Sequence, residues 1–296
     1  MYSDLISDDE TLVGLAKQST RLPATLRSRV EAFRDNAAPA GSLLLRSLPI
    51  GELPPTPPEP TSPTNKNHAT ELLLLSVAAV LGEPVGYQPE HGGDVVQNLV
   101  PVQSSSARQT STSSRVNLMF HTEAAFHPHR PKYLLLLCLR GDPEARTTVA
   151  SVHSALPHLS EDVINTLFQP RFRCAIDESY LHGRNNSLGA PMAVLSGSRS
   201  NPAMVFDEDL MVGTDEQADA ALRLLGATLA ANHDSVVLEA GDLVLLDNDM
   251  VVHGRSPFTP RFDGTDRWLQ RSMVVTDLAA SSSERNGRMI TTVFGD

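Results

Sequence analysis

Cysteine, lysine and long apolar runs are scarce in this 296-residue chain, and each shortage excludes something. The two cysteines, Cys138 and Cys174, lack the spacing of a metal-binding pair, so we expect both to be buried, reduced thiols. The longest apolar run, 72–81, is too short to cross a bilayer, and the N-terminus lacks the basic and apolar regions of a signal peptide. We therefore predict a cytoplasmic protein without a membrane segment.

Positive charge is scarce as well. The chain has 24 basic residues against 35 acidic ones, a formal net charge of −11 at pH 7, and its only lysines are Lys17, Lys66 and Lys132. A chain this acidic is a poor partner for the phosphates of nucleic acids or anionic lipids. The composition therefore argues against nucleic-acid and membrane partners.

The first part of the chain, 1–85, is expected to be mostly helical. Segments 23–36 and 69–81 show the apolar spacing of helices, and the second is apolar nearly all round, as in a buried helix. A first strand is expected at 42–48. The proline-rich segment 53–60 is expected to form an extended surface loop, because proline fixes φ and removes a hydrogen-bond donor.

From residue 86 to residue 278 the pattern changes to short apolar segments separated by turns, interrupted by two helices. Ser160 is a predicted N-cap of the first helix, and Thr214 with Gln217 forms a capping-box pattern for the second. Short strands with helices packed outside are typical of double-sheet folds. Strands are expected at 95–100, 116–120, 133–139, 147–152, 192–195, 236–238, 243–247 and 269–276.

We thus predict one domain over 1–296, mainly β with flanking helices, built on a double-stranded β-helix (jelly-roll) core and ending in a tail, 279–296. Two segments rich in small polar residues, 103–114 and 178–190, are expected to be mobile loops and candidate lids over a site.

His121 and Glu123 stand two residues apart, so on a strand both side chains would leave the same face. One such pair is expected by chance in a chain with 10 histidines and 35 acidic residues, so a solvated pair on a sheet face is the alternative. His253, which follows the predicted strand 243–247, completes a set of two histidines and one carboxylate. That set covers one octahedral face and leaves positions open, as in iron(II) oxygenases, whereas structural zinc needs four protein ligands.

Arg267 precedes the predicted strand 269–276, where a guanidinium can bind a carboxylate bidentately. Iron(II) with open positions and an arginine clamp are what 2-oxoglutarate requires, with its keto acid on the metal and its far carboxylate on the arginine. The alternative for Arg267 is a surface ion pair with Asp263 or Asp266.

Two stretches of sequence resemble the clavaminate synthase-like branch of the Fe(II)/2-oxoglutarate oxygenases. They are 120–140, which contains the His121 and Glu123 pair, and 247–271, which contains His253 and Arg267. The likeness covers roughly 41–278 and is greatest to bacterial enzymes that hydroxylate free L-asparagine and L-arginine for peptide antibiotics. It implies iron held by His121, Glu123 and His253, with 2-oxoglutarate and O2 as co-substrates and a free amino acid as the small-molecule substrate.

The resemblance also implies roles for individual residues. Arg267 and Thr147 match residues that hold 2-oxoglutarate, and Arg271 matches the residue near the substrate's α-carboxylate. Glu90 lies where such enzymes place the side chain that receives the α-amino group, and Ser111 where one contacts polar atoms of the substrate.

Asp207 and Asp209 resemble the Asp-x-Asp of the arginine hydroxylases, whose carboxylates bind a guanidinium; the alternative is an acidic surface loop. The resemblance therefore predicts hydroxylation at C3 or C4 of a basic L-amino acid such as arginine or lysine, with succinate and CO2 as co-products. An asparagine-type hydroxylase, a desaturase or cyclase of the same family, and a non-catalytic metal-binding jelly roll are the alternatives. His127 and His129, flanked by prolines, are expected to be structural, and Trp268 is expected to pack on the face opposite Arg267.

Overall fold

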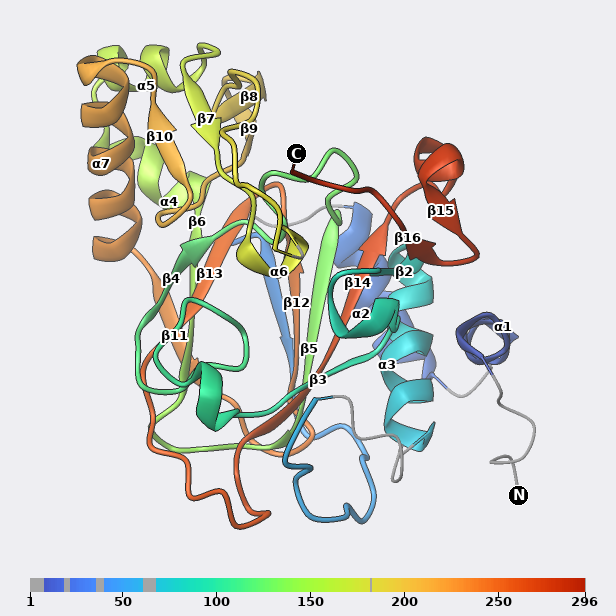
Figure 1. Cartoon of the computed structure of the whole chain (residues 1–296). Coiled ribbons are helices and arrows are strands. Elements are labelled where there is room, and N and C mark those ends of the chain that lie inside the picture. The colour runs from blue at the N-terminus through green and yellow to red at the C-terminus, as the bar shows by residue number, and fades with distance from the viewer. Residues whose placement is uncertain (1–7, 19–21, 36–39, 61–67, 182, 296) are drawn as a thin grey trace.

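The computed structural model describes residues 8–18, 22–35, 40–60, 68–181 and 183–295. Two sheets lie against each other, helices cover the outer face of the larger sheet, and a smaller unit of helices and hairpins lies at one end (Figure 1). The prediction of a mainly β protein with flanking helices is confirmed.

The larger sheet has the strand order β1-β12-β5-β14-β2-β16-β15, and β3 pairs with β14 beside this path. Its described strands pair antiparallel, apart from the parallel pair of β16 with β2. The strands are β1 (Ser42–Leu45), β2 (Glu83–Tyr87), β3 (Gln97–Leu99), β5 (Tyr133–Arg140), β12 (Leu243–Asp247), β14 (Trp268–Val275), β15 (Arg285–Asn286) and β16 (Met289–Ile290).

The smaller sheet has the order β11-β6-β13-β4 and holds β4 (Leu118–His121), β6 (Arg146–Ser151), β11 (Asp234–Val237) and β13 (Val251–Arg255). The chain alternates between the two sheets from β4 to β6 and again from β11 to β14. Each crossing carries the chain from one layer to the other, so residues distant in sequence meet between the sheets. The two crossings also return β4 and β13 to the same sheet as neighbours, where His121 and His253 are register partners.

Strand β5 shows why the core has two layers. Leu134, Leu136 and Cys138 belong to the apolar cluster between the sheets. Leu135 and Leu137 alternate with them and pack instead with the helices on the outer face. The continuous apolar run of this strand is therefore explained by burial on both faces, as the sequence predicted.

Helices account for most of the N-terminal part. The three that cover the larger sheet are α1 (Asp9–Gln18), α2 (Ala24–Asp35) and α3 (His68–Leu81), and the last two match the predicted helical segments. Strand β1 ends earlier than expected, at Leu45; two residues later Ser47 has a φ of 57°, which an extended strand does not adopt. Trp268 is buried among these helices, as predicted.

The smaller unit has its own apolar cluster. It holds α5 (Glu161–Leu167), α7 (Glu216–Ala231), β7 (Phe172–Cys174), β8 (Leu195–Ser198), β9 (Asn201–Met204) and β10 (Met211–Gly213), with α4 (Val152–Ala155) leading into it. The remaining short elements are α6 (Glu178–Leu181) and the 3-10 helices η2 (His91–Gly93), η3 (Gln103–Ser105), η4 (Leu156–His158) and η5 (Ala279–Glu284).

Three local predictions were wrong. Asp215, not Thr214, caps α7, because its carboxylate accepts from the Ala218 N–H at 3.0 Å. The predicted strand 192–195 is mostly a loop that bridges β7 through Met192, and β8 begins only at Leu195. The expected loop 178–190 opens with the helix α6. Ser160 does cap α5.

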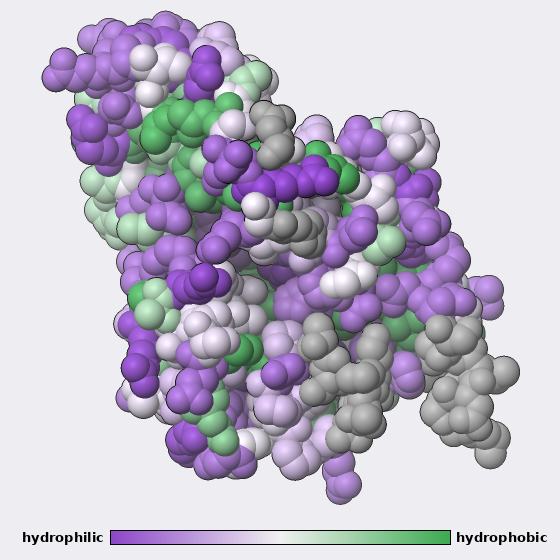
Figure 2. Space-filling view, in the orientation of Figure 1, coloured by the Kyte–Doolittle hydropathy of each residue, from purple (hydrophilic) through white to green (hydrophobic). Residues whose placement is uncertain are grey.

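The surface and the thiols agree with the composition. Hydrophilic side chains predominate on the face shown in Figure 2. Cys138 and Cys174 are free and buried, and burial raises the pKa of each thiol to about 12. Among the described residues, none of the helices combines the length and hydrophobicity of a transmembrane span.

Candidate active site

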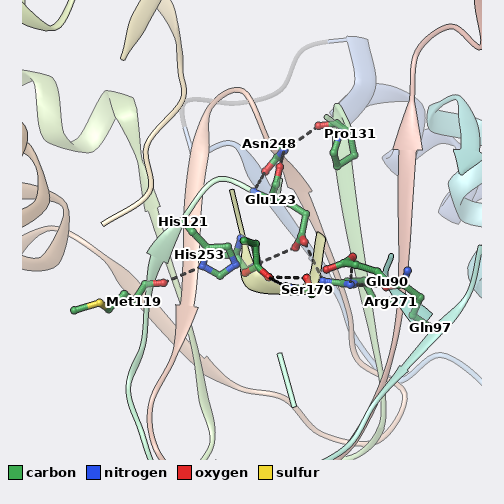
Figure 3. A network of polar contacts seen from close by, with 11 residues as sticks. Glu90, Gln97, Met119, His121, Glu123, Pro131, Ser179, Asn248, His253 and Arg271 are labelled. Atoms are coloured by element: carbon green, nitrogen blue, oxygen red, sulfur yellow. Dashed lines mark hydrogen bonds and ion pairs between the residues drawn. The ribbon is translucent and has the colours of Figure 1, made fainter. Parts of the chain in front are cut away.

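His121, Glu123 and His253 meet between the two sheets. Their ligating atoms all lie within 4.8 Å of one another, and His253 Nε2 is 3.7 Å from Glu123 Oε2. Figure 3 shows the two imidazoles side by side, with ring centroids 4.3 Å apart. Two nitrogens and one carboxylate on a single side leave the other side open, which suits iron(II) with room for a co-substrate. The predicted ligand set is therefore brought together.

Both histidines are held in the form that binds metal. Nδ1 of His121 donates to the Met119 carbonyl at 2.9 Å, which leaves Nε2 free as a ligand. Burial, helped by the nearby His121 and Arg271, holds the pKa of His253 well below its usual value, so its imidazole is neutral. His253 thus offers a lone pair, and the hydrogen bond of His121 leaves its Nε2 as the ligand atom.

Glu123 lies two residues beyond β4, which ends at His121. Its position is fixed through its main chain: its N–H donates to Asn248 Oδ1 at 2.8 Å, and its carbonyl accepts from Asn248 Nδ2 at 3.0 Å. The same Asn248 amide also donates to the Pro131 carbonyl (Figure 3). The next residue, Ala124, has a φ of 51°. The carboxylate therefore reaches the histidines from a clamped turn rather than from a strand face.

A cavity of about 50 Å³ lies beside the ligands and contains Arg267, Thr147 and Arg255. Arg267 is 7% exposed and makes no hydrogen bond or ion pair with any residue that the structure describes. Its guanidinium lies 5.9 Å from the Phe258 ring. The surface ion pair with Asp263 or Asp266 is thus not formed, and the buried guanidinium faces the cavity without an ion-pair partner among the described residues.

Thr147 supports the same reading of this cavity. It is buried, and its hydroxyl has no hydrogen-bond partner among the described residues. A buried hydroxyl without a partner is unfavourable unless a ligand supplies one. The two residues fit a dicarboxylate whose far end is held by a guanidinium and a hydroxyl, and we name this the co-substrate cavity.

A second cavity, of about 240 Å³, opens on the other side of His121 and Glu123. All five residues predicted to contact the substrate line it, and Ser111 borders both cavities. They are Glu90, Ser111, Asp207, Asp209 and Arg271. We name this the amino-acid cavity.

Arg271 organises the inner wall of the amino-acid cavity. Its guanidinium donates to Glu123 Oε1 at 3.0 Å and to Glu90 Oε2 at 2.7 Å, and two of its nitrogens donate to Gln97 Oε1 (Figure 3). These carboxylates hold the pKa of Arg271 above its usual value despite burial. Burial raises the pKa of Glu90 to about 7, against the attraction of Arg271 and with help from Glu123 and Asp177.

Asp207 and Asp209 form the outer wall. Asp207 is buried beside His121, and Oδ1 of its carboxylate accepts from the N–H groups of Asp209 and Leu210 at 3.0 and 2.9 Å. Burial raises its pKa, while His121 and the two backbone donors lower it. Asp209 is exposed but lines the same cavity. The pair is therefore at the site and is not a remote acidic loop.

Several residues of the site escaped sequence reasoning. Arg255 stands two positions after His253 on β13, a signal that the strand period could have revealed. Asn248 lies within a stretch that matched the family, but nothing in its type indicated a main-chain clamp. Asp177 and Tyr180 line the amino-acid cavity from the segment around α6. Tyr180 lies within the predicted candidate lid 178–190, but no motif singled out either residue. Only the fold brings that segment to the metal ligands.

His127 and His129 were expected to be structural, and the surroundings of His127 fit that expectation. His127 is buried within an aromatic cluster and lies 4.9 Å from Tyr87, measured between ring centroids. Its Nδ1 accepts from the His129 N–H at 2.9 Å. Burial, together with the nearby His129, lowers its pKa to about 3, so it is a neutral packing residue behind the amino-acid cavity.

Two histidines, one carboxylate and a co-substrate cavity with a free arginine define a non-haem iron dioxygenase site. The family model "Taurine catabolism dioxygenase TauD, TfdA family" matches residues 22–273. The chain belongs to this family and is a 2-oxoglutarate-dependent dioxygenase.

Known proteins from the amino-acid branch are similar over nearly the whole chain. An L-asparagine oxygenase of Streptomyces coelicolor is 41% identical and covers 94% of this chain and 84% of its own length. An L-lysine 3-hydroxylase of Catenulispora acidiphila is 36% identical and covers 93% and 79%. The crystal structure of the non-heme iron oxygenase OrfP with Fe, succinate and (3S)-hydroxy-L-Arg has a TM-score of 0.87 at 32% identity, covering 95% and 91%. The resemblance found in the sequence is confirmed.

Proposed function

We propose that this enzyme hydroxylates C3 of a free basic L-amino acid, such as arginine, lysine or ornithine. The supporting observation is the charge of the amino-acid cavity. Among the described residues, five carboxylates and one arginine line it. The carboxylates belong to Glu90, Glu123, Asp177, Asp207 and Asp209, and the arginine is Arg271. His91 also lines it, but burial lowers its pKa to about 4, so it is neutral at pH 7.

This charge favours a cationic side chain over a neutral one. Iron(II) adds two positive charges beside Glu123, and Arg271 adds one, against up to five negative charges. The head group of an amino acid is a zwitterion and changes nothing in that count. An excess of up to two negative charges therefore remains for the side chain. Asp207, which is bridged to His121, and Asp209 supply two of the carboxylates that could bind it.

The residues of the chain bind, orient and shield. Iron(II) with 2-oxoglutarate and O2, when bound, supplies the oxidising power that replaces a C–H by C–OH, with succinate and CO2 as co-products. Arg271 would hold the α-carboxylate and Glu90 the α-ammonium group. Because these two side chains also contact each other beside Glu123, the head group is anchored next to the metal and a carbon near the α-carbon faces it.

The experiment is a panel of free amino acids with Fe(II), 2-oxoglutarate and O2, followed by succinate release and product mass. We expect turnover with arginine, lysine or ornithine and a gain of one oxygen atom. C3-deuterated substrate should lose one deuterium. Turnover with asparagine but with none of the basic amino acids would overturn the basic-substrate proposal. Loss of two hydrogens without a gain of oxygen would indicate a desaturase or cyclase instead.

The second candidate is hydroxylation of asparagine. It is favoured by the 41% identity to the L-asparagine oxygenase of Streptomyces coelicolor. The same panel separates the two candidates, because Asp209 would have no cationic partner in asparagine.

We also infer that the two sheets form one jelly-roll domain. The alternation of the chain between the sheets from β11 to β14 supports this topology. Co-operative thermal unfolding in a single transition is the result expected of one domain.

A further inference from the structure

The co-substrate cavity contains a second buried guanidinium that the proposed function does not use. Arg255 is 4% exposed and lines this cavity with Arg267. Both guanidinium groups lie over the ring of Phe258, at 5.1 and 5.9 Å from its centroid. No carboxylate forms an ion pair with either arginine among the residues that the structure describes. Two buried guanidinium groups that share a cavity and have no ion-pair partner among the described residues favour binding of a dianion.

Arg255 is placed there by the strand period. It follows His253 by two positions on β13, so both side chains leave the same face. Its partner in the ladder with β6 is Thr147, the residue with the unpaired buried hydroxyl. The backbone of the smaller sheet thus brings Arg255 and Thr147 to one end of the cavity and leaves His253 at the metal end.

Arg255 also holds the polar segment 103–114. Its Nη2 donates to Ser113 Oγ at 3.0 Å, and Ser113 Oγ in turn donates to the Thr110 carbonyl at 2.7 Å. The ring beneath the guanidinium is tied to the same segment, because the Phe258 N–H donates to the Ser114 carbonyl at 2.8 Å. Ser113 is itself buried. The guanidinium is therefore hydrogen-bonded to the segment on one side and open to the co-substrate cavity on the other.

The other part of this segment borders the amino-acid cavity. Gln109, Thr110, Ser111 and Thr112 all line it. The chain of bonds from Arg255 through Ser113 ends on the Thr110 carbonyl, within that wall. A movement of the guanidinium toward an anion would thus act directly on residues that contact the amino acid.

We propose that Arg255 is a positioning residue that couples the two cavities. Binding of the far carboxylate of 2-oxoglutarate fixes the Arg255 guanidinium, which fixes segment 103–114 through Ser113 and so completes the wall of the amino-acid cavity. The coupling has two effects. The first, ordering of segment 103–114 by 2-oxoglutarate, does not involve the amino acid. The second, stronger binding of the amino acid, rests on the proposed function.

The test is hydrogen exchange of the 103–114 amides in the anaerobic Fe(II)-loaded protein, with and without saturating 2-oxoglutarate. Segment amides should exchange roughly fivefold or more slowly with 2-oxoglutarate in the wild type. In Ser113→Ala this slowing should be lost. Ser114→Ala is the matched control. It removes a buried hydroxyl of the same segment that has no hydrogen-bond partner among the described residues. Exchange in this variant should still slow when 2-oxoglutarate binds. 2-Oxobutyrate, which lacks the far carboxylate, should not slow exchange in any variant.

Calorimetry supplies the second measurement. 2-Oxoglutarate should bind Ser113→Ala within about threefold of wild type, and Arg255→Met roughly tenfold more weakly. Equal slowing of exchange by 2-oxoglutarate in wild type and Ser113→Ala would overturn the coupling. So would loss of the slowing in both Ser113→Ala and Ser114→Ala, because that would indicate general loosening of the segment. If no amino acid is turned over while these results hold, the proposed substrate is wrong and the coupling stands.

Discussion

The co-substrate cavity and the amino-acid cavity share a wall that includes His121, Glu123 and Arg271, yet their other walls carry opposite charge. Beyond the shared wall, the charged side chains of the first are the guanidinium groups of Arg255 and Arg267, while apolar residues such as Leu136 fill in around them. The second is lined by four more carboxylates and has no other lysine or arginine among its described lining residues. The two cavities meet at the metal ligands and differ in charge everywhere else.

This difference sorts the two organic molecules that the enzyme must bind side by side. A dianion is favoured in the cavity with two arginines and opposed in the acidic one, and a cationic amino acid has the reverse preference. Charge alone therefore favours 2-oxoglutarate in the co-substrate cavity and the amino acid in the amino-acid cavity, independently of their shapes. Substitutions that remove one charged or titrating group from either cavity, or from the residues behind it, test this difference.

The largest effect is expected from Arg267→Met, which removes the free guanidinium from the co-substrate cavity. Loss of one partner from a buried charge pair typically costs about 2–5 kcal/mol. We expect the KM for 2-oxoglutarate to rise roughly a hundredfold or more, with little change in the affinity for the amino acid. Steady-state kinetics with each substrate varied in turn would check this.

Arg261→Met serves as the control for that variant. Arg261 is exposed and lies six residues earlier, with its guanidinium 3.8 Å from Asp263. The substitution Arg261→Met removes the same charge outside the cavity and should leave the KM for 2-oxoglutarate unchanged. An equal effect of both variants would show that net charge, and not the clamp, governs 2-oxoglutarate binding.

A smaller effect is expected from Asp209→Asn in the amino-acid cavity. Asp209 lines the cavity and its side chain makes no hydrogen bond or ion pair within the described residues, so the fold should be undisturbed. A charged hydrogen bond to a cationic side chain contributes about 1.5–3 kcal/mol. We expect kcat/KM for the preferred basic amino acid to fall roughly tenfold to a hundredfold.

The neighbouring Glu208→Gln is the matched control for Asp209→Asn. It removes the same charge, but its carboxylate accepts from the Phe120 N–H and does not line the cavity. The ratio of kcat/KM for arginine over asparagine should drop in Asp209→Asn alone. An unchanged ratio would mean that the acidic wall does not select the side chain.

Glu90→Gln tests the inner wall through pH. The raised pKa of Glu90, about 7, leaves its carboxyl largely protonated at pH 6 and ionised at pH 8. Because only the carboxylate pairs with an α-ammonium group, amino-acid binding should strengthen roughly tenfold over this range in the wild type. The amide does not titrate, so the variant should show a flat profile. The KM for 2-oxoglutarate at both pH values is the internal control; if the variant keeps the wild-type profile, another group titrates.

The cluster of His121, Glu123 and His253, the buried Arg267 and the long strands were predictable because each depends on local pattern. β5 and β12 are continuous apolar runs, and His253 and Arg267 stand at fixed distances from such runs. The five residues expected to contact the substrate came from the resemblance, and the structure gathers them in one cavity. Whether each contacts a substrate stays a prediction.

The rest could not be predicted because it depends on contacts between distant segments. Asp177 lines the amino-acid cavity although it lies more than fifty residues beyond the metal-ligand pair and in no recognisable motif. Asn248 and Glu123 are joined by a main-chain clamp that no side-chain pattern encodes. The turn at Ala124, with positive φ, is likewise imposed by this clamp and not by a glycine.

The smallest effect concerns what lies behind the acidic cavity. His127 sits there in a neutral aromatic cluster, and its depressed pKa, about 3, means that it binds no proton in the folded protein near neutral pH. The unfolded chain binds one near its ordinary value of 6.5, so stability contributed by the neutral imidazole is present above that pH and is lost as pH falls toward 3. Between pH 6.5 and 5.5 the loss of stability amounts to about 1 kcal/mol.

In His127→Asn the amide can still accept from the His129 N–H but does not titrate. Urea unfolding at both pH values should therefore show a smaller drop in unfolding free energy for the variant, by about that amount, whatever the substitution does to stability at pH 7. An equal drop in both proteins would show that other groups cause the loss of stability in acid. It would also contradict the assignment of His127 as a neutral residue behind the amino-acid cavity.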